Sequence, residues 1–185
     1  MIKTSKLNAT TVGVPQHGTF WCIPASIENL LRSEALTDIT QEVLIHQYLV
    51  QNVRTGKSAT GQTVQLSSLP KFAVLESCRC QPIPDASFQT FAPITNAILA
   101  KLGVPQKLAY TDGITTQDDY FSKVEGILRL DKPVLISAKN QAGWHITVVY
   151  QSDGTTLWSY DPGEDRHVTL AKSEYEFSHD LLYVQ

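Results

Sequence analysis

The sequence predicts an α+β fold in which a helical region comes first and an antiparallel sheet follows. Apolar residues recur at helical spacing through the first two thirds of the chain, whereas the last third is rich in β-branched and aromatic residues. Asp153-Gly154 separates two of these β-type runs and is a typical hairpin signal. Helices followed by strands indicate two lobes with a cleft between them.

Two helices are predicted near the N-terminus. Apolar residues from Ile23 to Leu31 repeat at helical spacing. Since Pro24 is tolerated only in a first turn, the first helix should begin at about Cys22. The second helix covers residues 40–52, where apolar side chains form a stripe.

Three further helices are predicted in the middle of the chain. One begins near Val64 and runs through Phe72, although Pro70 favours a break or a first-turn position there. The others cover residues 94–102 and 117–128, and a glycine and a proline end the first of them.

The strands of the last third are predicted at residues 133–138, 145–151 and 156–160. The second and third of these, with the turn between them, form a hairpin in an antiparallel sheet.

The chain is expected to form one domain. Its 185 residues, 42% of them hydrophobic, suffice for one core, and the sequence has no internal repeat and no linker rich in Pro, Gly and Ser. We expect a helical lobe at about 1–110 and a sheet lobe at about 111–185.

Charge and hydropathy argue against two classes of partner. The 15 basic and 18 acidic residues give a net charge of −3 and form no long runs, so no nucleic-acid partner is predicted. The N-terminus lacks the apolar segment of a signal peptide, and no stretch approaches the ~18 apolar residues of a membrane span, so no membrane partner is predicted either.

The three cysteines do not suggest a disulfide framework. Cys78 and Cys80 are too close in sequence for an easy mutual bridge, and a strained or intermolecular disulfide stays open. No second pair of cysteines stands at ligand spacing, so we expect free or partly buried thiols, a reducing compartment and no metal.

Four polar residues form a candidate catalytic site. Cys22, at a helix N-terminus and near an imidazolium, should be a nucleophile whose thiolate is populated near neutral pH. His145 would be the general base and then the general acid. Asp161 would hold the imidazole in the correct tautomer. Gln16, with the Cys22 backbone N–H, would bind an oxyanion.

In this order Gln16, Cys22, His145 and Asp161 resemble the active-site residues of papain-like cysteine peptidases. In that superfamily a Gln precedes the helix-capping Cys by six positions, and a strand His is followed by an Asn or Asp. The Asp-Pro step in a compact chain is most similar to bacterial members, which include bacteriocin leader peptidases and injected effector proteases. The resemblance implies a papain-like fold with the site between the lobes, and no metal or organic cofactor.

Each of these residues also has a simpler interpretation. Cys22 could be a small core residue, His145 a core or edge histidine of a strand, Asp161 a turn residue and Gln16 a polar loop residue. Trp21 and Trp144 are cleft-lining candidates, and Trp158 could also wall the cleft; a core role is at least as common for a tryptophan. His17 has no obvious orienting partner. His46, His167 and His179 are expected to be structural or exposed.

The hairpin register provides a structural test of this site. A two-residue loop, Asp153-Gly154, would place Asp161 opposite Ile146, on the wrong face for His145. A three-residue loop, Ser152-Asp153-Gly154, would place Asp161 opposite His145. We predict the three-residue loop or an equivalent bulge.

The function predicted on this basis is hydrolysis of a peptide or isopeptide bond through a Cys22 thioester. One alternative is an acyltransferase or deamidase on the same triad, like a transglutaminase or a phytochelatin synthase. A second alternative is an inert module that binds a peptide in the same cleft. The partners expected are a protein or peptide substrate and an activating or inhibitory protein.

The expected biological setting follows from the short segment before Gln16. Fifteen residues precede it, which is too few for an autoinhibitory prodomain of the usual kind. An unguarded protease must spare its producer, so we expect a bacterial effector or toxin, either cytoplasmic or delivered into another cell.

Overall fold

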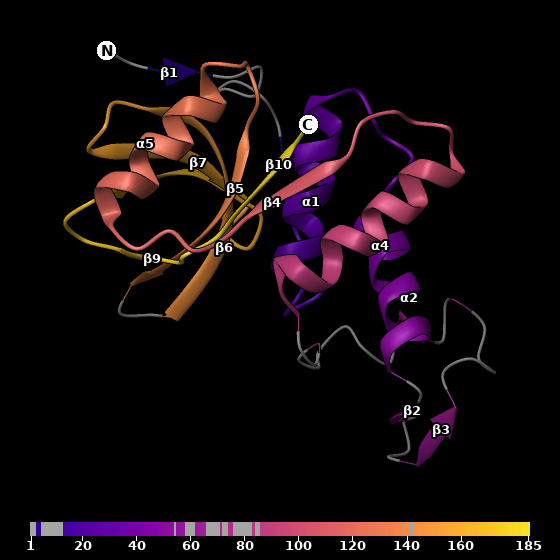
Figure 1. The fold of residues 1–185 in the computed structure, drawn as a ribbon. Coiled ribbons are helices and arrows are strands. Elements are labelled where there is room, and N and C mark those ends of the chain that lie inside the picture. Colours follow the sequence, from indigo (N-terminus) through magenta and orange to yellow (C-terminus); the bar gives the residue numbers. More distant parts are fainter. Residues whose placement is uncertain are drawn as a thin grey trace.

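The computed structural model of the chain has an α+β architecture, with an antiparallel sheet between two unequal helical layers (Figure 1). Among the four helices with described bounds, two pack on one face of the sheet with a third packed against them, and the fourth packs on the other face. The structure describes residues 3–4, 13–53, 55–57, 62–65, 71, 74–75, 83, 86–140 and 143–185.

The helices of the described residues lie close to their predicted positions. They are α1 (Cys22–Ser33), α2 (Gln41–Asn52), α4 (Phe88–Lys101) and α5 (Gln117–Leu128). The start of α1 at Cys22 and the extents of α2 and α5 confirm the prediction.

The helix α4 begins six residues earlier than predicted, because a capping box fixes its start. The Ser87 hydroxyl accepts from the Thr90 backbone N–H, while the Thr90 side chain accepts from the Ser87 backbone N–H. Pro93 lies inside the helix. The prediction began after this proline, and that was wrong because the cap outweighs it.

The main sheet is antiparallel. Its described strands are β1 (Lys3–Thr4), β4 (Leu108–Thr111), β5 (Val134–Asn140), β6 (Gly143–Ser152), β7 (Thr156–Asp161), β8 (Arg166–Ala171), β9 (Glu176–Phe177) and β10 (Leu181–Val184). The order is β4-β10-β5-β6-β7-β8, with β1 on β6 and β9 on β5. The predicted strands correspond to β5, β6 and β7; β4, β8 and β10 were not predicted.

A small hairpin of β2 (Thr55–Lys57) and β3 (Thr63–Gln65) stands apart from the main sheet. It shows that the helix predicted to begin near Val64 was wrong at its start, because Val64 pairs with Gly56. Most of the remainder of that predicted helix, including Phe72, lies outside the described residues. Cys78 and Cys80 also lie outside them.

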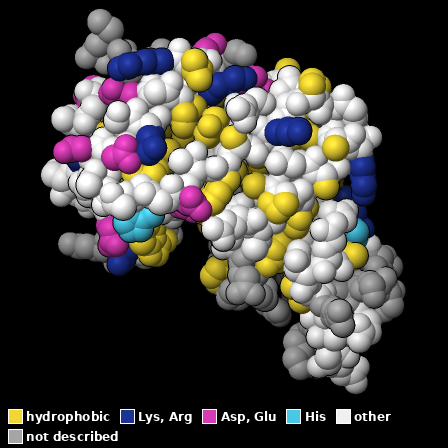
Figure 2. Space-filling model, viewed as in Figure 1, with side chains coloured by type: hydrophobic (Ala, Val, Ile, Leu, Met, Phe, Trp, Pro, Cys, Tyr) yellow, Lys and Arg dark blue, Asp and Glu magenta, His cyan; other side chains and the backbone are white. Residues whose placement is uncertain are grey.

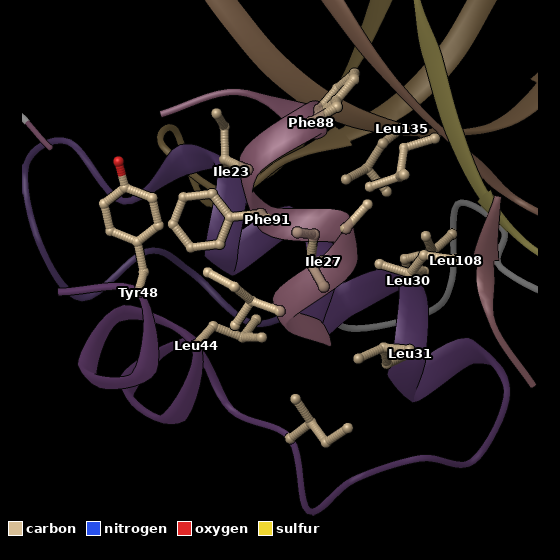
Figure 3. Packing of buried hydrophobic residues seen from close by; sticks show 14 of the residues in the cluster. Ile23, Ile27, Leu30, Leu31, Leu44, Tyr48, Phe88, Phe91, Leu108 and Leu135 are labelled. Carbon is tan, nitrogen blue, oxygen red and sulfur yellow. The ribbon is translucent and has the colours of Figure 1, made fainter. Parts of the chain in front are cut away.

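Alternation along β5 separates two hydrophobic cores. Leu135 packs in the cluster with α1, α2 and α4, whereas Val134 and Ile136 pack in the cluster with α5. Because successive side chains of a strand point to opposite faces, the cores cover opposite faces of the sheet. In Figure 3, Ile23 and Ile27 of α1 lie beside Phe91 of α4.

The outer surface differs between the helical half, formed by α1, α2 and α4, and the sheet half, formed by the main sheet and α5. In the view of Figure 2 the Asp and Glu side chains lie over the sheet half, while hydrophobic side chains reach the surface over the junction with the helices. None of the helices in the described ranges is both long enough and apolar enough to cross a bilayer.

Candidate active site

The nucleophile candidate Cys22 is the first residue of α1, at a helix start that no side chain caps. The first backbone N–H groups of a helix have no partner within the helix. At this end the amides of Cys22 and Ile23 interact with the Cys22 sulfur, and so does the amide of Ile146 on β6. The sulfur therefore lies where the start of α1 meets the strand that carries His145.

The predicted resting thiolate of Cys22 is not supported. Burial raises the pKa of the Cys22 thiol above its ordinary value, and the negative charge of Asp161 raises it further. The amides of Cys22, Ile23 and Ile146 lower the pKa, but by less. The prediction counted the helix dipole and left out desolvation, which is the largest influence on this pKa.

The base candidate and its orienter face each other at the cleft. His145 Nδ1 lies 3.6 Å from Asp161 Oδ2; the His145 side chain is 40% exposed and that of Asp161 is 7% exposed. This distance exceeds that of a hydrogen bond, but catalytic hydrogen bonds often lengthen in the absence of substrate. Asp161 is thus placed to orient His145.

A β-bulge brings Asp161 to the face of His145. Near the turn Ser152 pairs with Leu157, a register that would set Asp161 opposite Val148, on the other face. The register shifts between Val149 and Gln151, so that farther along Val148 pairs with Tyr160. Extended by one pair, this register sets Asp161 opposite Thr147, on the same face as His145 and two residues from it.

The predicted loop was therefore wrong. The alternative, a bulge, is present, but it does not produce the predicted pairing of Asp161 with His145. The residues between β6 and β7 are 153–155, one position later than predicted. The carboxylate of Asp153 causes this shift, because it accepts from the backbone N–H groups of Thr155 (2.9 Å) and Thr156 (2.8 Å). Asp161 is diagonal to His145 and not directly opposite it.

The two carboxylate oxygens of Asp161 have separate tasks. Oδ1 accepts from the backbone N–H groups of Gly163 at 2.8 Å and Glu164 at 3.2 Å, which is an Asx turn. Oδ2 faces His145. The turn role and the orienting role of Asp161 thus coexist, since the turn fixes the carboxylate that points at the imidazole.

Gln16 lies beside this turn. Its backbone N–H donates to the Pro162 carbonyl at 2.8 Å, and its side-chain Nε2 donates to the Thr19 carbonyl at 3.1 Å. A Cβ atom placed on Gly163 would lie 3.3 Å from Gln16 Oε1. A side-chain amide has two N–H donors, so the bond to Thr19 leaves one for an oxyanion.

The two tryptophans predicted to line the cleft differ in position. Trp21 is fully buried in the core with α1, so this assignment was wrong for Trp21. It covers Gly18, where a Cβ atom would lie 2.7 Å from the Trp21 ring. Trp144 is 49% exposed, with Lys139 Nζ 5.7 Å from its ring centroid, and does line a cavity.

Of the remaining histidines, His167 lines the same cavity as His145 and Asp161. The expectation for His17 was wrong. His17 does have an orienting partner, because its Nδ1 contacts Glu42 Oε1 on α2. His167 Nδ1 lies 3.1 Å from the Tyr150 hydroxyl, and His179 Nδ1 contacts the Ile114 carbonyl.

Two cavities flank the candidate site. One of about 200 Å³ is lined by Ile23, next to Cys22, and by Ile146, Trp144, Phe88 and Asp180 among others. The other, of about 380 Å³, is lined by His145, Asp161, Thr147, Trp158 and Arg166 among others. The first cavity is therefore lined by the residue that follows the nucleophile, and the second by the base itself.

Three buried polar residues around the segment of Gln16 escaped the prediction: Glu28, Asn29 and Gln41. A signal was present, because Glu28 and Asn29 interrupt the apolar run of α1 and occupy positions that a helix of this pattern buries. Buried polar side chains require hydrogen-bond partners: Asn29 and Gln41 bind the backbone of the segment, and Glu28 binds Gln41.

Within the described part of the chain, no three side chains of His, Cys, Asp or Glu are grouped so as to hold a metal ion. No protein-family model matches the chain, and no curated protein matches its sequence.

Proposed function

We propose that the chain is a papain-like cysteine peptidase that hydrolyses a peptide or isopeptide bond through a thioester on Cys22. The observation that carries this proposal is the convergence of four distant residues at one junction. The sulfur of Cys22 meets the amide next to His145, His145 is paired with Asp161, and the turn of Asp161 binds the backbone of Gln16.

Acylation begins at the buried thiol. His145 takes the Sγ proton while Sγ attacks the carbonyl carbon of the scissile bond, which forms the S–C bond and an oxyanion. Because the pKa of Cys22 is raised, His145 acts as a general base during the attack and does not meet a preformed thiolate. Asp161 stabilises the resulting imidazolium.

The oxyanion needs donors in a fixed position. The Cys22 backbone N–H and the Gln16 side-chain amide are the candidates, and losing one such donor costs on the order of 10²-fold in turnover. His145 then gives its proton to the leaving nitrogen, and the C–N bond breaks. Water attacks the thioester with His145 again as the base, the C–S bond breaks, the acid is released, and His145 returns the proton to Sγ.

The two cavities suggest how a substrate lies. The acyl part bonds to Cys22, so its side chains would enter the cavity beside Ile23 and Ile146. The leaving amine receives its proton from His145, so that part would lie toward the cavity beside His145 and Asp161. Substrate on both sides would also exclude water from His145 and Asp161.

A second candidate function is an inert peptide-binding module in the same cleft. The observation that favours it is the raised pKa of the Cys22 thiol, since a protonated thiol is a poor nucleophile. This candidate predicts peptide binding without turnover.

Digestion of a synthetic peptide library by the full chain, followed by mass spectrometry, tests the proposal against both alternatives. The peptidase predicts new chain ends that disappear with Cys22→Ala. Deamidation or cross-links would indicate the acyltransferase or deamidase. Peptides retained by wild type and Cys22→Ala alike, with no product, would indicate the binding module and contradict the proposal.

A further inference from the structure

Among the described residues, no strand pairs with the segment that carries Gln16, and side chains hold it instead. At its start, the Val14 backbone N–H donates to Asn29 Oδ1 at 2.7 Å, and Asn29 Nδ2 donates back to the Val14 carbonyl at 2.8 Å. The amide of Asn29 thus binds both backbone groups of one residue, as a paired strand would. Asn29 itself is almost fully buried in α1.

The other end of the segment is held by Gln41, the first residue of α2. Gln41 Oε1 accepts from the His17 backbone N–H at 2.8 Å, and Gln41 Nε2 donates to the Pro15 carbonyl at 3.0 Å. The two amide side chains therefore fix the backbone on both sides of Gln16.

Gln41 is itself held by a buried carboxylate. Glu28 Oε2 accepts from the Gln41 backbone N–H at 2.9 Å and lies 3.3 Å from Gln41 Nε2. Arg32 compensates the charge of Glu28, with Nε 2.9 Å and NH2 2.8 Å from Oε1. A buried carboxylate is tolerated when it is paired and hydrogen-bonded in this way, and such a network has little freedom to move.

Gln16 lies between the residues that Asn29 and Gln41 bind, and it is bound to the sheet half as well. Its backbone N–H donates to the carbonyl of Pro162, the residue after Asp161. The Gln16 amide is thus held in a fixed position relative to α1, which begins with Cys22, and relative to the turn that orients His145.

We propose that Asn29 and Gln41 are positioning residues for the oxyanion donor Gln16. This inference rests on the proposed function. Donors to an oxyanion are effective only when they are fixed within about 0.5 Å of their productive place. The Asn29 and Gln41 amides supply that rigidity to a segment that has no ladder of its own.

Two reactions of Cys22 separate positioning from general stability. p-Nitrophenyl acetate forms an oxyanion as the S–C bond forms, the p-nitrophenolate leaves, and the thiol proton goes to His145. Iodoacetamide reacts by displacement of iodide at a saturated carbon and forms no oxyanion. A positioning role therefore affects the first reaction and spares the second.

The experiment measures both rates by intact mass on the full chain, for wild type, Asn29→Ala and Gln41→Ala. We expect acetylation of Cys22 to slow about 10-fold to 10²-fold in each variant, with alkylation within about twofold of wild type. Gln41→Met, which keeps the side-chain volume, replaces Gln41→Ala if that variant unfolds.

Asn96→Ala is the matched control. The amide of Asn96 binds the Leu108 backbone N–H at 2.7 Å and the Leu108 carbonyl at 3.0 Å, the same two-bond arrangement on a segment that carries no site residue. We expect it to lower stability much as Asn29→Ala does and to change neither rate.

A double variant tests whether Gln41 acts through Gln16. Gln16→Ala with Gln41→Ala should acetylate no more slowly than Gln16→Ala alone. If Gln16→Ala is slow while Asn29→Ala and Gln41→Ala acetylate like wild type, the positioning inference is overturned and the proposed function stands. Failure of wild type to acetylate at Cys22 would overturn both.

Discussion

The helical half and the sheet half of the molecule position their site residues by different means. In the sheet half, ladder pairing with one bulge sets the relation of His145 to Asp161. In the helical half, Gln16 stands on a segment whose backbone is bound by the side chains of Asn29 and Gln41.

Because the two halves are held differently, the site is sensitive to substitutions in different places. Backbone ladders survive most single substitutions, because each hydrogen bond is one of many and involves no side chain. A segment held by two amide side chains loses its position with either of them. We therefore expect the sheet half to fail at His145, at Asp161 and at the turn that fixes the Asp161 carboxylate, and the helical half to fail also at buried amide side chains far from the substrate.

The largest expected effect comes from removing one reacting residue from each half. Cys22→Ala and His145→Ala should each lower cleavage of a library-derived peptide by about 10³-fold or more, and the double variant should be no worse, because the two residues act as a unit. The measurement is kcat, with His46→Ala on α2 as the control. Multiplying losses in the double variant would contradict a shared step.

Asp161→Asn should change two reactions of Cys22 in opposite directions. Turnover should fall by about 10²-fold to 10⁴-fold, because the imidazole loses its orienter. Burial is the main cause of the raised Cys22 pKa, and the Asp161 charge adds to it. Removing that charge lowers the pKa, so more thiolate exists at a given pH and alkylation by iodoacetamide should speed up.

The readout of this prediction is the pH profile of alkylation beside kcat. Asp165→Asn is the matched control, since Asp165 lies in the same turn and accepts from the Tyr160 hydroxyl at 2.6 Å. An alkylation midpoint that stays in place in Asp161→Asn would show that the Asp161 charge does not reach Cys22.

Gly163→Ala tests the contact between the halves. The added Cβ would lie 3.2 Å from Asp161 Oδ1 and 3.3 Å from Gln16 Oε1, so both groups must shift by a few tenths of an ångström. We expect turnover to fall about tenfold, because small displacements of catalytic groups are costly. Thermal unfolding should be nearly unchanged. Gly126→Ala, where a Cβ meets nothing within 4 Å, should leave kcat unaltered.

The smallest effect is expected at a hydrogen bond that joins α1 to β6. The buried Ser26 hydroxyl donates to the Ile146 carbonyl at 3.2 Å. Ser26→Ala should lower the free energy of unfolding by about 1 kcal/mol in urea titrations. Thr95→Ala removes a buried hydroxyl that bonds within α4, to the Phe91 carbonyl, and is its control. A change in kcat above about threefold in Ser26→Ala alone would mean that this bond positions Cys22.

Periodicity in the sequence was enough to predict α1, α2, α5 and the strands β5 to β7. It failed for α4, where the capping box of Ser87 and Thr90 fixes a start that the apolar pattern does not mark. It also failed at Val64, because a short hairpin has too few residues to show a period.

The members of the candidate site could be proposed from the sequence, but its geometry and electrostatics could not. Residue types and order indicated Cys22, His145, Asp161 and Gln16. The bulge that sets the register depends on how many residues the loop consumes, and the carboxylate of Asp153 decides that locally. The raised pKa of Cys22 and the burial of Trp21 both depend on distant segments that pack around these residues. Sequence spacing does not encode that packing.

The most direct test of the account is the rate at which p-nitrophenyl acetate acetylates Cys22 at neutral pH, in wild type and in His145→Ala. The account predicts rapid acetylation of Cys22 in wild type, and a rate at least about 10²-fold lower without His145, because a protonated thiol needs the base. Equal rates in the two proteins, or acetylation elsewhere with Cys22 unmodified, would contradict it.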